Sequence, residues 1–228
     1  MQQKIKEIEK QFDNIAIEAF QSFDLLRDGT LYEFAELEVY LIDPSKNIED
    51  IYIHKDEKQL IDKNQQHLYW HYSGVDICMG DEDKEIYCGV LIRGVVKKED
   101  LKQSKITKES VIYGPGRVAY NWNPKNERKL ELVEKKEVSD LFLVENMNQA
   151  TKLQNIIFKL PRVNLSAERT KQYFRLKKFN EVEIYLNLKA RYIRVFNNDF
   201  VSPKSIAPAE TRGLIKEYLL LQREGNIL

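Results

Sequence analysis

Apolar residues recur every three or four positions near the start of the chain, from Ile5 to Phe23. This spacing places them on one side of an α-helix and predicts an amphipathic helix that packs on a core. Asp28-Gly29 supplies a turn that ends the helix. We therefore expect a helical N-terminal segment over residues 1–28.

Apolar and polar residues alternate from Leu31 to Ile42, and Asp43-Pro44 follows. A period of two with Tyr, Phe, Val and Ile is typical of a β-strand that buries one face. The predicted strand carries Glu36, Glu38 and Tyr40 on its polar face.

The rest of the chain gives a series of strand patterns and few helical ones. Residues 45–66 are polar and predict a long loop with one helical turn, and residues 97–110 predict a charged helix. Strand patterns occupy 68–79, 85–96, 138–145, 156–165, 181–187 and 190–196, with an acidic turn at 80–84, and a helical pattern covers 208–225. No Ser/Gly-rich linker divides the chain. We expect one α+β domain over residues 1–228: a curved, mostly antiparallel sheet in a body spanning 29–205, flanked by helices.

Composition narrows the function only slightly. The 228 residues include 36 Lys and Arg against 36 Asp and Glu, so the net charge is zero, and bulk charge alone would not hold the protein to nucleic acid or anionic lipid. Cys78 and Cys88 are too few for a disulfide framework and lack the spacing of a zinc motif. The start of the chain is charged, and no apolar run approaches a membrane span. We expect a cytoplasmic protein without metal, cofactor, membrane or obligate protein partner.

The pattern Glu36-x-Glu38-x-Tyr40 places two carboxylates and a phenol side by side, because residues two apart on a strand share a face. A partly desolvated carboxylate in such a group can act as a general base. A solvated strand face bearing two acids is the alternative interpretation.

Aromatic residues are dense at Tyr69, Trp70, His71 and Tyr72, just before Gly74. Aromatic faces can sandwich a flat ligand such as a nucleobase, and the alternative is ordinary core packing.

Three further positions carry candidate chemistry. His54 lies alone in the long loop, Arg93 lies near the end of its strand, and Arg117 follows the turn Gly-Pro-Gly at residues 114–116. Arg93 could orient a water or pair with an acid, and the turn could offer backbone amides to an anion or be a plain tight turn.

Taken in order, these pieces resemble the alkyladenine (3-methyladenine) DNA glycosylase family, which removes alkylated purines from DNA. The matching motifs extend from Leu31 to Ser202. They are Glu36-x-Glu38-x-Tyr40, Glu49-Asp50-x-x-x-His54, Gly74 with Cys78-Met79, Val90-Leu91-x-Arg93, Gly114-Pro115-Gly116-Arg117, Arg162-Val163, and Asn198 with Phe200-Val201-Ser202.

The resemblance implies a role for each matched residue. It makes Glu38 the base that activates the attacking water and Arg93 the cation that holds this water. It implies stacking of a flipped base by Tyr40, His54 and Trp70, and phosphate binding by Arg117. It also implies double-stranded DNA with an alkylated base as the partner.

The chain departs from the family at three places. Gly80 replaces an Asn that screens the bound purine, Ser73 replaces a Tyr that wedges into the DNA stack, and no Arg precedes Asn64. Loss of the Asn favours cationic over neutral bases. The sequence therefore predicts a monofunctional DNA N-glycosylase in base excision repair, with a non-catalytic module that binds a flat ligand, nucleic acid or protein as the alternative.

Overall fold

A computed structural model describes residues 2–60, 67–102, 106–107, 109–120, 129–136, 141–144, 156–160, 162, 165, 170–172, 184–185 and 188–195. Of the strand predicted over 138–145, the structure describes residues 141–144, which include strand β9 (Phe142–Val144). Of the strand predicted over 181–187 it describes residues 184 and 185, which are helical, and the predicted helix at 208–225 lies wholly outside the described residues. No helix among these residues is long and apolar enough to cross a membrane.

The described residues form an α+β fold around one curved sheet, as predicted. The helices are α1 (Gln2–Ser22), α2 (Lys98–Lys102) and α3 (Pro115–Ala119). The strands are β1 (Phe23–Arg27), β2 (Thr30–Asp43), β3 (Ile48–Glu49), β4 (His67–His71), β5 (Gly74–Cys78), β6 (Tyr87–Lys97), β7 (Val111–Tyr113), β8 (Leu130–Glu134), β9 (Phe142–Val144), β10 (Ile156–Leu160) and β11 (Arg191–Val195).

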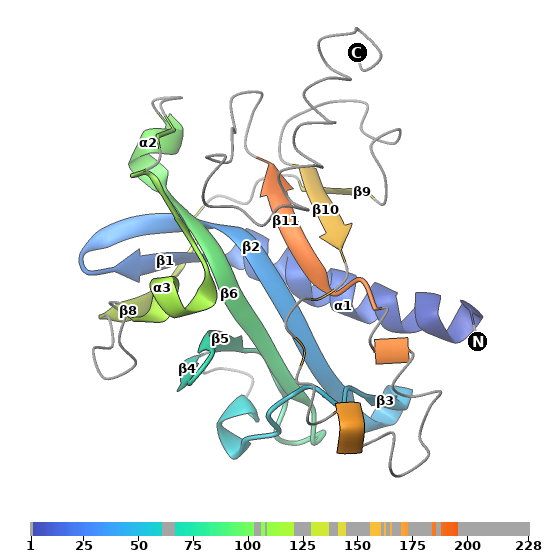
Figure 1. Ribbon diagram of the computed structural model, residues 1–228. Coiled ribbons are helices and arrows are strands. Elements are labelled where there is room, and N and C mark those ends of the chain that lie inside the picture. Colours follow the sequence, from blue (N-terminus) through green and yellow to red (C-terminus); the bar gives the residue numbers. More distant parts are fainter. Residues whose placement is uncertain are drawn as a thin grey trace, which may run out of the picture.

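The main strand order is β4-β5-β6-β2-β11-β10-β9, with β1, β3, β7 and β8 attached beside it. The described pairings are antiparallel except for β9 with β10. Strand β2 pairs with β6 along one edge and with β1, β3 and β11 along the other, so it is an inner strand of the sheet. Figure 1 shows β2 and β6 running side by side through the centre.

The core lies between α1 and one face of the sheet. Phe12, Ala16 and Phe20 of α1 are fully buried, and they belong to one apolar cluster with Leu37 and Val39 of β2. Figure 1 shows α1 behind the sheet. Burying this stripe stabilises the helix far more than its intrinsic propensity does.

Several sequence predictions of secondary structure are wrong in detail. The helix predicted over 97–110 is limited, among the described residues, to α2, Lys98–Lys102. The first helix ends at Ser22, and Phe23–Arg27 forms strand β1, which the tight turn at Asp28-Gly29 connects to β2. The strand predicted over 68–79 is a hairpin of β4 and β5, which turns at Tyr72-Ser73. The loop at 45–66 does contain short helical turns, at Pro44–Lys46 and Glu57–Gln59.

Candidate active site

The face of β2 opposite the core carries the predicted Glu38 and Tyr40. Tyr40 donates a hydrogen bond from its hydroxyl to Glu38 Oε1 at 2.6 Å. The Glu38 side chain has no exposed surface. The two residues meet because they are two apart on one strand.

Arg93 joins the same cluster through irregular pairing of β6 with β2. Glu36 pairs with Gly94 and Leu37 with Ile92, so Arg93 has no direct partner across the strands. Such bulges re-aim side chains. Here Arg93 Nε donates to Glu36 Oε1 at 2.8 Å, and Arg93 Nη1 lies 3.0 Å from Glu38 Oε2, an ion pair without hydrogen-bond geometry.

A second arginine completes this side of the cluster. Arg191 pairs with Glu38 across β11 and β2, and its Nε lies 3.4 Å from Glu36 Oε1. Its side chain is fully buried. Glu36 therefore lies between two guanidinium groups. Glu38 accepts the hydrogen bond of Tyr40 at Oε1 and lies beside Arg93 at Oε2.

Electrostatics favours a basic carboxylate at Glu38. Burial raises the pKa of the Glu38 carboxyl, and the opposing effects of Arg93 and Tyr40 do not cancel it. Burial and the neighbouring Glu38 also raise the pKa of the Tyr40 phenol well above its ordinary value. Tyr40 therefore stays protonated at neutral pH and donates to Glu38.

Arg162 covers one face of Tyr40. Its guanidinium carbon lies 4.8 Å from the centre of the Tyr40 ring and 5.3 Å from that of Tyr52. The two terminal nitrogens pair with the two carboxylate oxygens of Asp50, at 3.2 Å for Nη2 and Oδ1, and Nη2 also donates to the Tyr185 carbonyl. A flat ligand that stacks on Tyr40 must therefore use the opposite face of the ring or displace Arg162.

Strand register places Trp70 away from Glu38, which corrects the prediction that it stacks on the same ligand. Asp76 pairs with Leu91, which pairs with Glu38, so Asp76 shares the face of Glu38. Trp70 pairs with Val75, the neighbour of Asp76, and so lies on the core face. It packs against the apolar core there.

His71, the next residue, lies on the face of Glu38 and meets the predicted His54. The ring centres of His54 and His71 are 4.7 Å apart, and the Tyr69 ring stacks on His71 with its centre 5.6 Å away. His71 Nε2 lies 3.0 Å from Asp76 Oδ1, which fixes the imidazole. The sequence analysis singled out this aromatic run but assigned the stacking role to Trp70, which lies on the opposite face from Glu38.

Gly80 has no room for a side chain. A Cβ atom there would lie 2.1 Å from the Gln59 carbonyl oxygen and 2.3 Å from that of Ile86. The close approach of these backbone segments requires glycine. Gly80, which the family resemblance placed at a base-binding position in place of an Asn, therefore serves the packing of the loop at Glu57–Gln59 on the β5–β6 connection.

Arg117 and the tip of the β4–β5 hairpin lie close together. Arg117 belongs to α3, and Pro115 of the same helix would touch a Cβ atom at Gly74. At the tip, the side chain of Tyr72 is 88% exposed, and it is the only large hydrophobic side chain exposed among the described residues. The family resemblance places such a residue one position later, at 73, where this chain has Ser.

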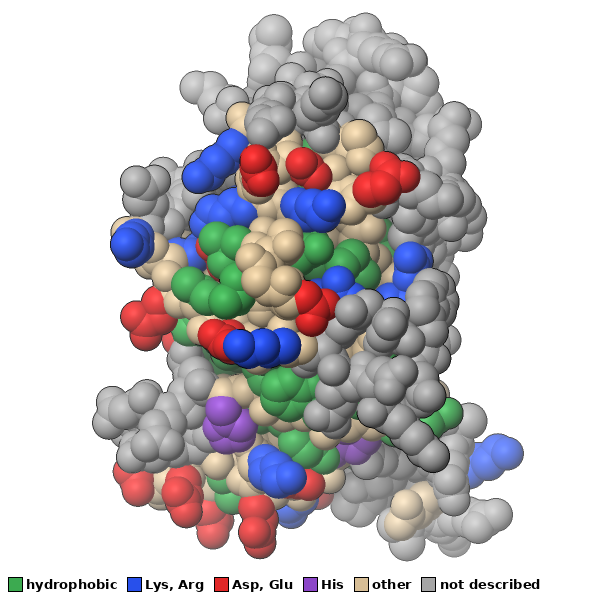
Figure 2. Space-filling view, turned by 90° about the vertical axis from the view of Figure 1, so that its left-hand side faces the viewer, with side chains coloured by type: hydrophobic (Ala, Val, Ile, Leu, Met, Phe, Trp, Pro, Cys, Tyr) green, Lys and Arg blue, Asp and Glu red, His purple; other side chains and the backbone are tan. Residues whose placement is uncertain are grey.

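Charged side chains of both signs are mixed on the surface that faces the viewer in Figure 2, together with apolar and histidine side chains.

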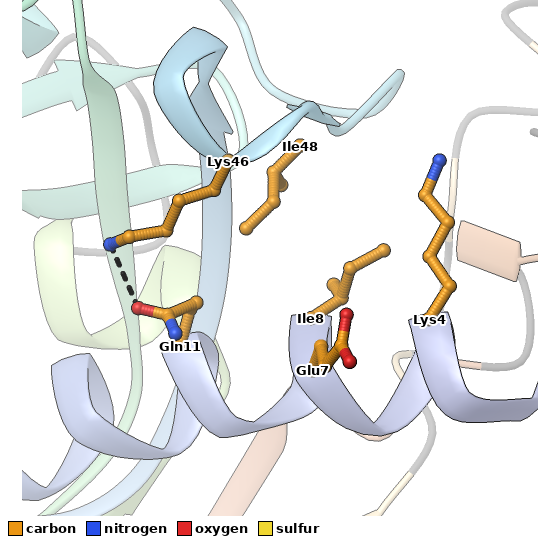
Figure 3. A pocket seen from close by; sticks show the side chains of 6 residues that line it. All are labelled: Lys4, Glu7, Ile8, Gln11, Lys46 and Ile48. Carbon is orange, nitrogen blue, oxygen red and sulfur yellow. Dashed lines mark hydrogen bonds between the residues drawn. The ribbon is translucent and has the colours of Figure 1, made fainter.

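A separate cleft of about 320 Å³ lies between α1 and the segment that follows β2, as Figure 3 shows. Ile8 and Ile48 lie in its wall, and none of the predicted site residues lines it. Among the residues that the structure describes, no three His, Cys, Asp or Glu side chains form a group that could hold a metal ion.

Comparison with known proteins adds no assignment: no protein-family model matches the chain, and neither does any curated protein sequence.

Proposed function

We propose that this protein is a DNA base-excision hydrolase that resembles the alkyladenine DNA glycosylases and removes alkylated purines. The observation that carries the proposal is the buried cluster of Glu38, Tyr40 and Arg93. A base, an aromatic ring and a cation converge there, which is the combination that the reaction needs.

In the proposed reaction, the nucleotide is extruded from the duplex and its base stacks on Tyr40. Glu38 accepts a proton from a water molecule while the water oxygen bonds to C1′ of the sugar. The C1′–N bond breaks, and its electron pair leaves with the purine. Arg93 steadies the water and limits the basicity of Glu38, and the reaction requires no metal or organic cofactor.

Cationic alkylpurines are the substrates that fit these residues best. A cationic base leaves as a neutral molecule, so it needs no proton donor. It is also attracted to the face of an aromatic ring by about 0.5–2 kcal/mol, and Tyr40 offers such a face. A neutral base such as hypoxanthine would leave slowly.

The hairpin tip supports contact with a duplex. An exposed aromatic side chain can enter the gap that an extruded base leaves in the stack, and Tyr72 is the exposed aromatic at the tip. Arg117, on the neighbouring α3, would contact a phosphate. A cytoplasmic location, as expected from the sequence, is part of the proposal.

A non-catalytic binding module is the second candidate, and two observations favour it. Glu38 has no exposed surface, and Arg162 already covers one face of Tyr40. In this alternative the cluster stabilises the sheet, and His54, Tyr69 and the hairpin tip contact the partner.

The deciding experiment measures abasic sites formed in duplex DNA that contains 7-methylguanine or 3-methyladenine. Wild type should form them, and Glu38→Gln should reduce the rate at least a hundredfold while the fold is retained. Glu33→Gln is the matched control, because Glu33 lies on the same strand but pairs with Arg194 and should keep the full rate. A wild-type protein that binds DNA without forming abasic sites would support the binding module instead.

A further inference from the structure

Tyr113 lies beside the Glu38 cluster, although no sequence motif points to it. It ends β7 and pairs with Gly94 of β6, which in turn pairs with Glu36. A Cβ atom at Gly94 would lie 2.7 Å from the Tyr113 ring and 3.3 Å from Glu36 Cβ. The missing side chain thus lets the Tyr113 ring pack directly against Gly94, on the face that carries Glu36 and Glu38.

The hydroxyl of Tyr113 is buried and has no hydrogen-bond partner among the residues that the structure describes, and Tyr113 itself is only 3% exposed. Other buried tyrosines differ: Tyr52, Tyr185 and Tyr192 each use their hydroxyl in a hydrogen bond. A buried polar group without a partner is costly and uncommon in native proteins. The hydroxyl is therefore a donor available to a bound molecule.

The order of side chains along β2 indicates which part of a bound nucleotide the Tyr113 hydroxyl would meet. Tyr40, Glu38 and Glu36 follow one another on the same face at about 7 Å per two residues. If the base stacks on Tyr40 and its glycosidic bond lies at Glu38, the sugar and its phosphates extend toward Glu36, where Tyr113 lies. Arg93 and Arg191 both approach Glu36, so this end of the cluster also carries positive charge.

We propose that Tyr113 binds the extruded nucleotide by donating a hydrogen bond from its hydroxyl to an oxygen of the sugar–phosphate backbone. This inference rests on the proposed glycosylase function and adds a substrate-binding residue to it. Burial and the nearby Glu36 raise the pKa of the Tyr113 phenol well above its ordinary value, so the group remains a donor throughout the neutral range.

Tyr113→Phe removes only the hydroxyl and tests the proposal directly. The probe is a duplex with a tetrahydrofuran abasic analogue, which keeps the sugar–phosphate backbone and lacks the base. We expect Tyr113→Phe to weaken binding of this duplex about three- to tenfold, and to weaken binding of a lesion-bearing duplex equally. Its thermal stability should equal or exceed that of wild type, because no internal hydrogen bond is lost.

Tyr192→Phe is the matched control. The Tyr192 hydroxyl is bonded to Asp13 of α1, so this variant should lose stability and keep its DNA affinity. Unchanged affinity in Tyr113→Phe would overturn the role of Tyr113 and leave the glycosylase proposal standing. A loss confined to the lesion-bearing duplex, or a loss of stability like that of Tyr192→Phe, would also overturn it. A wild-type protein that neither binds nor cleaves either duplex would overturn both proposals.

Discussion

Tyr40 donates its hydroxyl hydrogen to Glu38 across 2.6 Å, from a position two residues farther along the same strand. The acceptor is a carboxylate without exposed surface, in a cluster where Arg93 and Arg191 supply positive charge. Removing a charge from water is costly, and the partners offset this cost only in part. Such a group binds a proton more readily than an exposed carboxylate does, which is the property that a general base requires.

Glu38→Gln should therefore increase the free energy of unfolding above that of wild type as the pH rises. The pKa of Glu38 is higher in the folded protein than in the unfolded chain, so ionisation destabilises wild type from about pH 4.5 up to the folded pKa. Each tenfold increase in proton affinity corresponds to about 1.4 kcal/mol. The measurement is urea unfolding of both proteins at pH 4, 5.5 and 7.

Glu36→Gln provides the contrast. Glu36 accepts from Arg93 and lies beside Arg191, so its loss leaves two buried cations with less compensation. We expect it to destabilise the protein by about 3 kcal/mol at pH 7. If the difference in free energy of unfolding between Glu38→Gln and wild type stays constant with pH, the raised pKa assigned to Glu38 is wrong.

Gly80→Ala should destabilise the protein by more than about 3 kcal/mol, because the new Cβ atom would overlap two backbone carbonyls. Gly116→Ala is the control: a Cβ atom there meets nothing within 4 Å, and the residue lies in α3. It should be neutral or stabilise by up to about 1 kcal/mol. Thermal unfolding of the two variants would reveal the difference, and equal stabilities would refute the packing role of Gly80.

The sequence was sufficient to predict the strands whose alternation is regular. Residues 31–42 alternate nearly throughout, so β2 and the meeting of Glu38 with Tyr40 could be predicted, whereas the irregular pairing at Glu36 could not. The β4–β5 turn was not predicted, because the apolar and aromatic residues on both sides of the turn signal Ser73-Gly74 were assigned to one strand. A missed turn left the register of this segment unknown, and register decides whether Trp70 or His71 shares a face with Glu38.

Long-range pairing explains the other omissions. Arg162 was noted only as part of a short motif, and its partner Asp50 is 112 residues away in the chain. Tyr113 was passed over because its significance depends on Gly94 and Glu36, which belong to two other strands. Contacts of this kind follow from sheet topology and cannot be derived from local spacing.

Trp70→Ala should lower stability by about 2–3 kcal/mol and leave the DNA affinity of the folded protein unchanged, because Trp70 packs on the apolar core. His71→Ala should have the larger effect on binding, since His71 lies on the face of Glu38 beside His54. Binding is measured by fluorescence anisotropy at a temperature where both variants are folded. A loss of affinity in Trp70→Ala that exceeds that of His71→Ala would restore the original assignment.

Cys78 and Cys88 should resist alkylation in the native protein. Burial raises the pKa of Cys78 to about 12 and also raises that of Cys88, so almost no thiolate forms at pH 8. Both thiols are free and buried. Mass spectrometry after treatment with iodoacetamide should find no adduct until urea unfolds the chain, when two should appear. Rapid labelling of either thiol without urea would contradict this arrangement.

Tyr72→Ala and Arg117→Ala should weaken duplex binding in different ways. Tyr72 is uncharged and exposed, so its loss removes stacking worth about 1–2 kcal/mol, affects the duplex more than the single strand, and leaves the salt dependence unchanged. Arg117 would neutralise a phosphate, so its loss should reduce the slope of log affinity against log salt by about 0.9. Anisotropy titrations from 50 to 200 mM salt separate the two effects. If Tyr72→Ala binds duplex as tightly as wild type does, the hairpin tip does not enter the stack, and its exposed ring has another role.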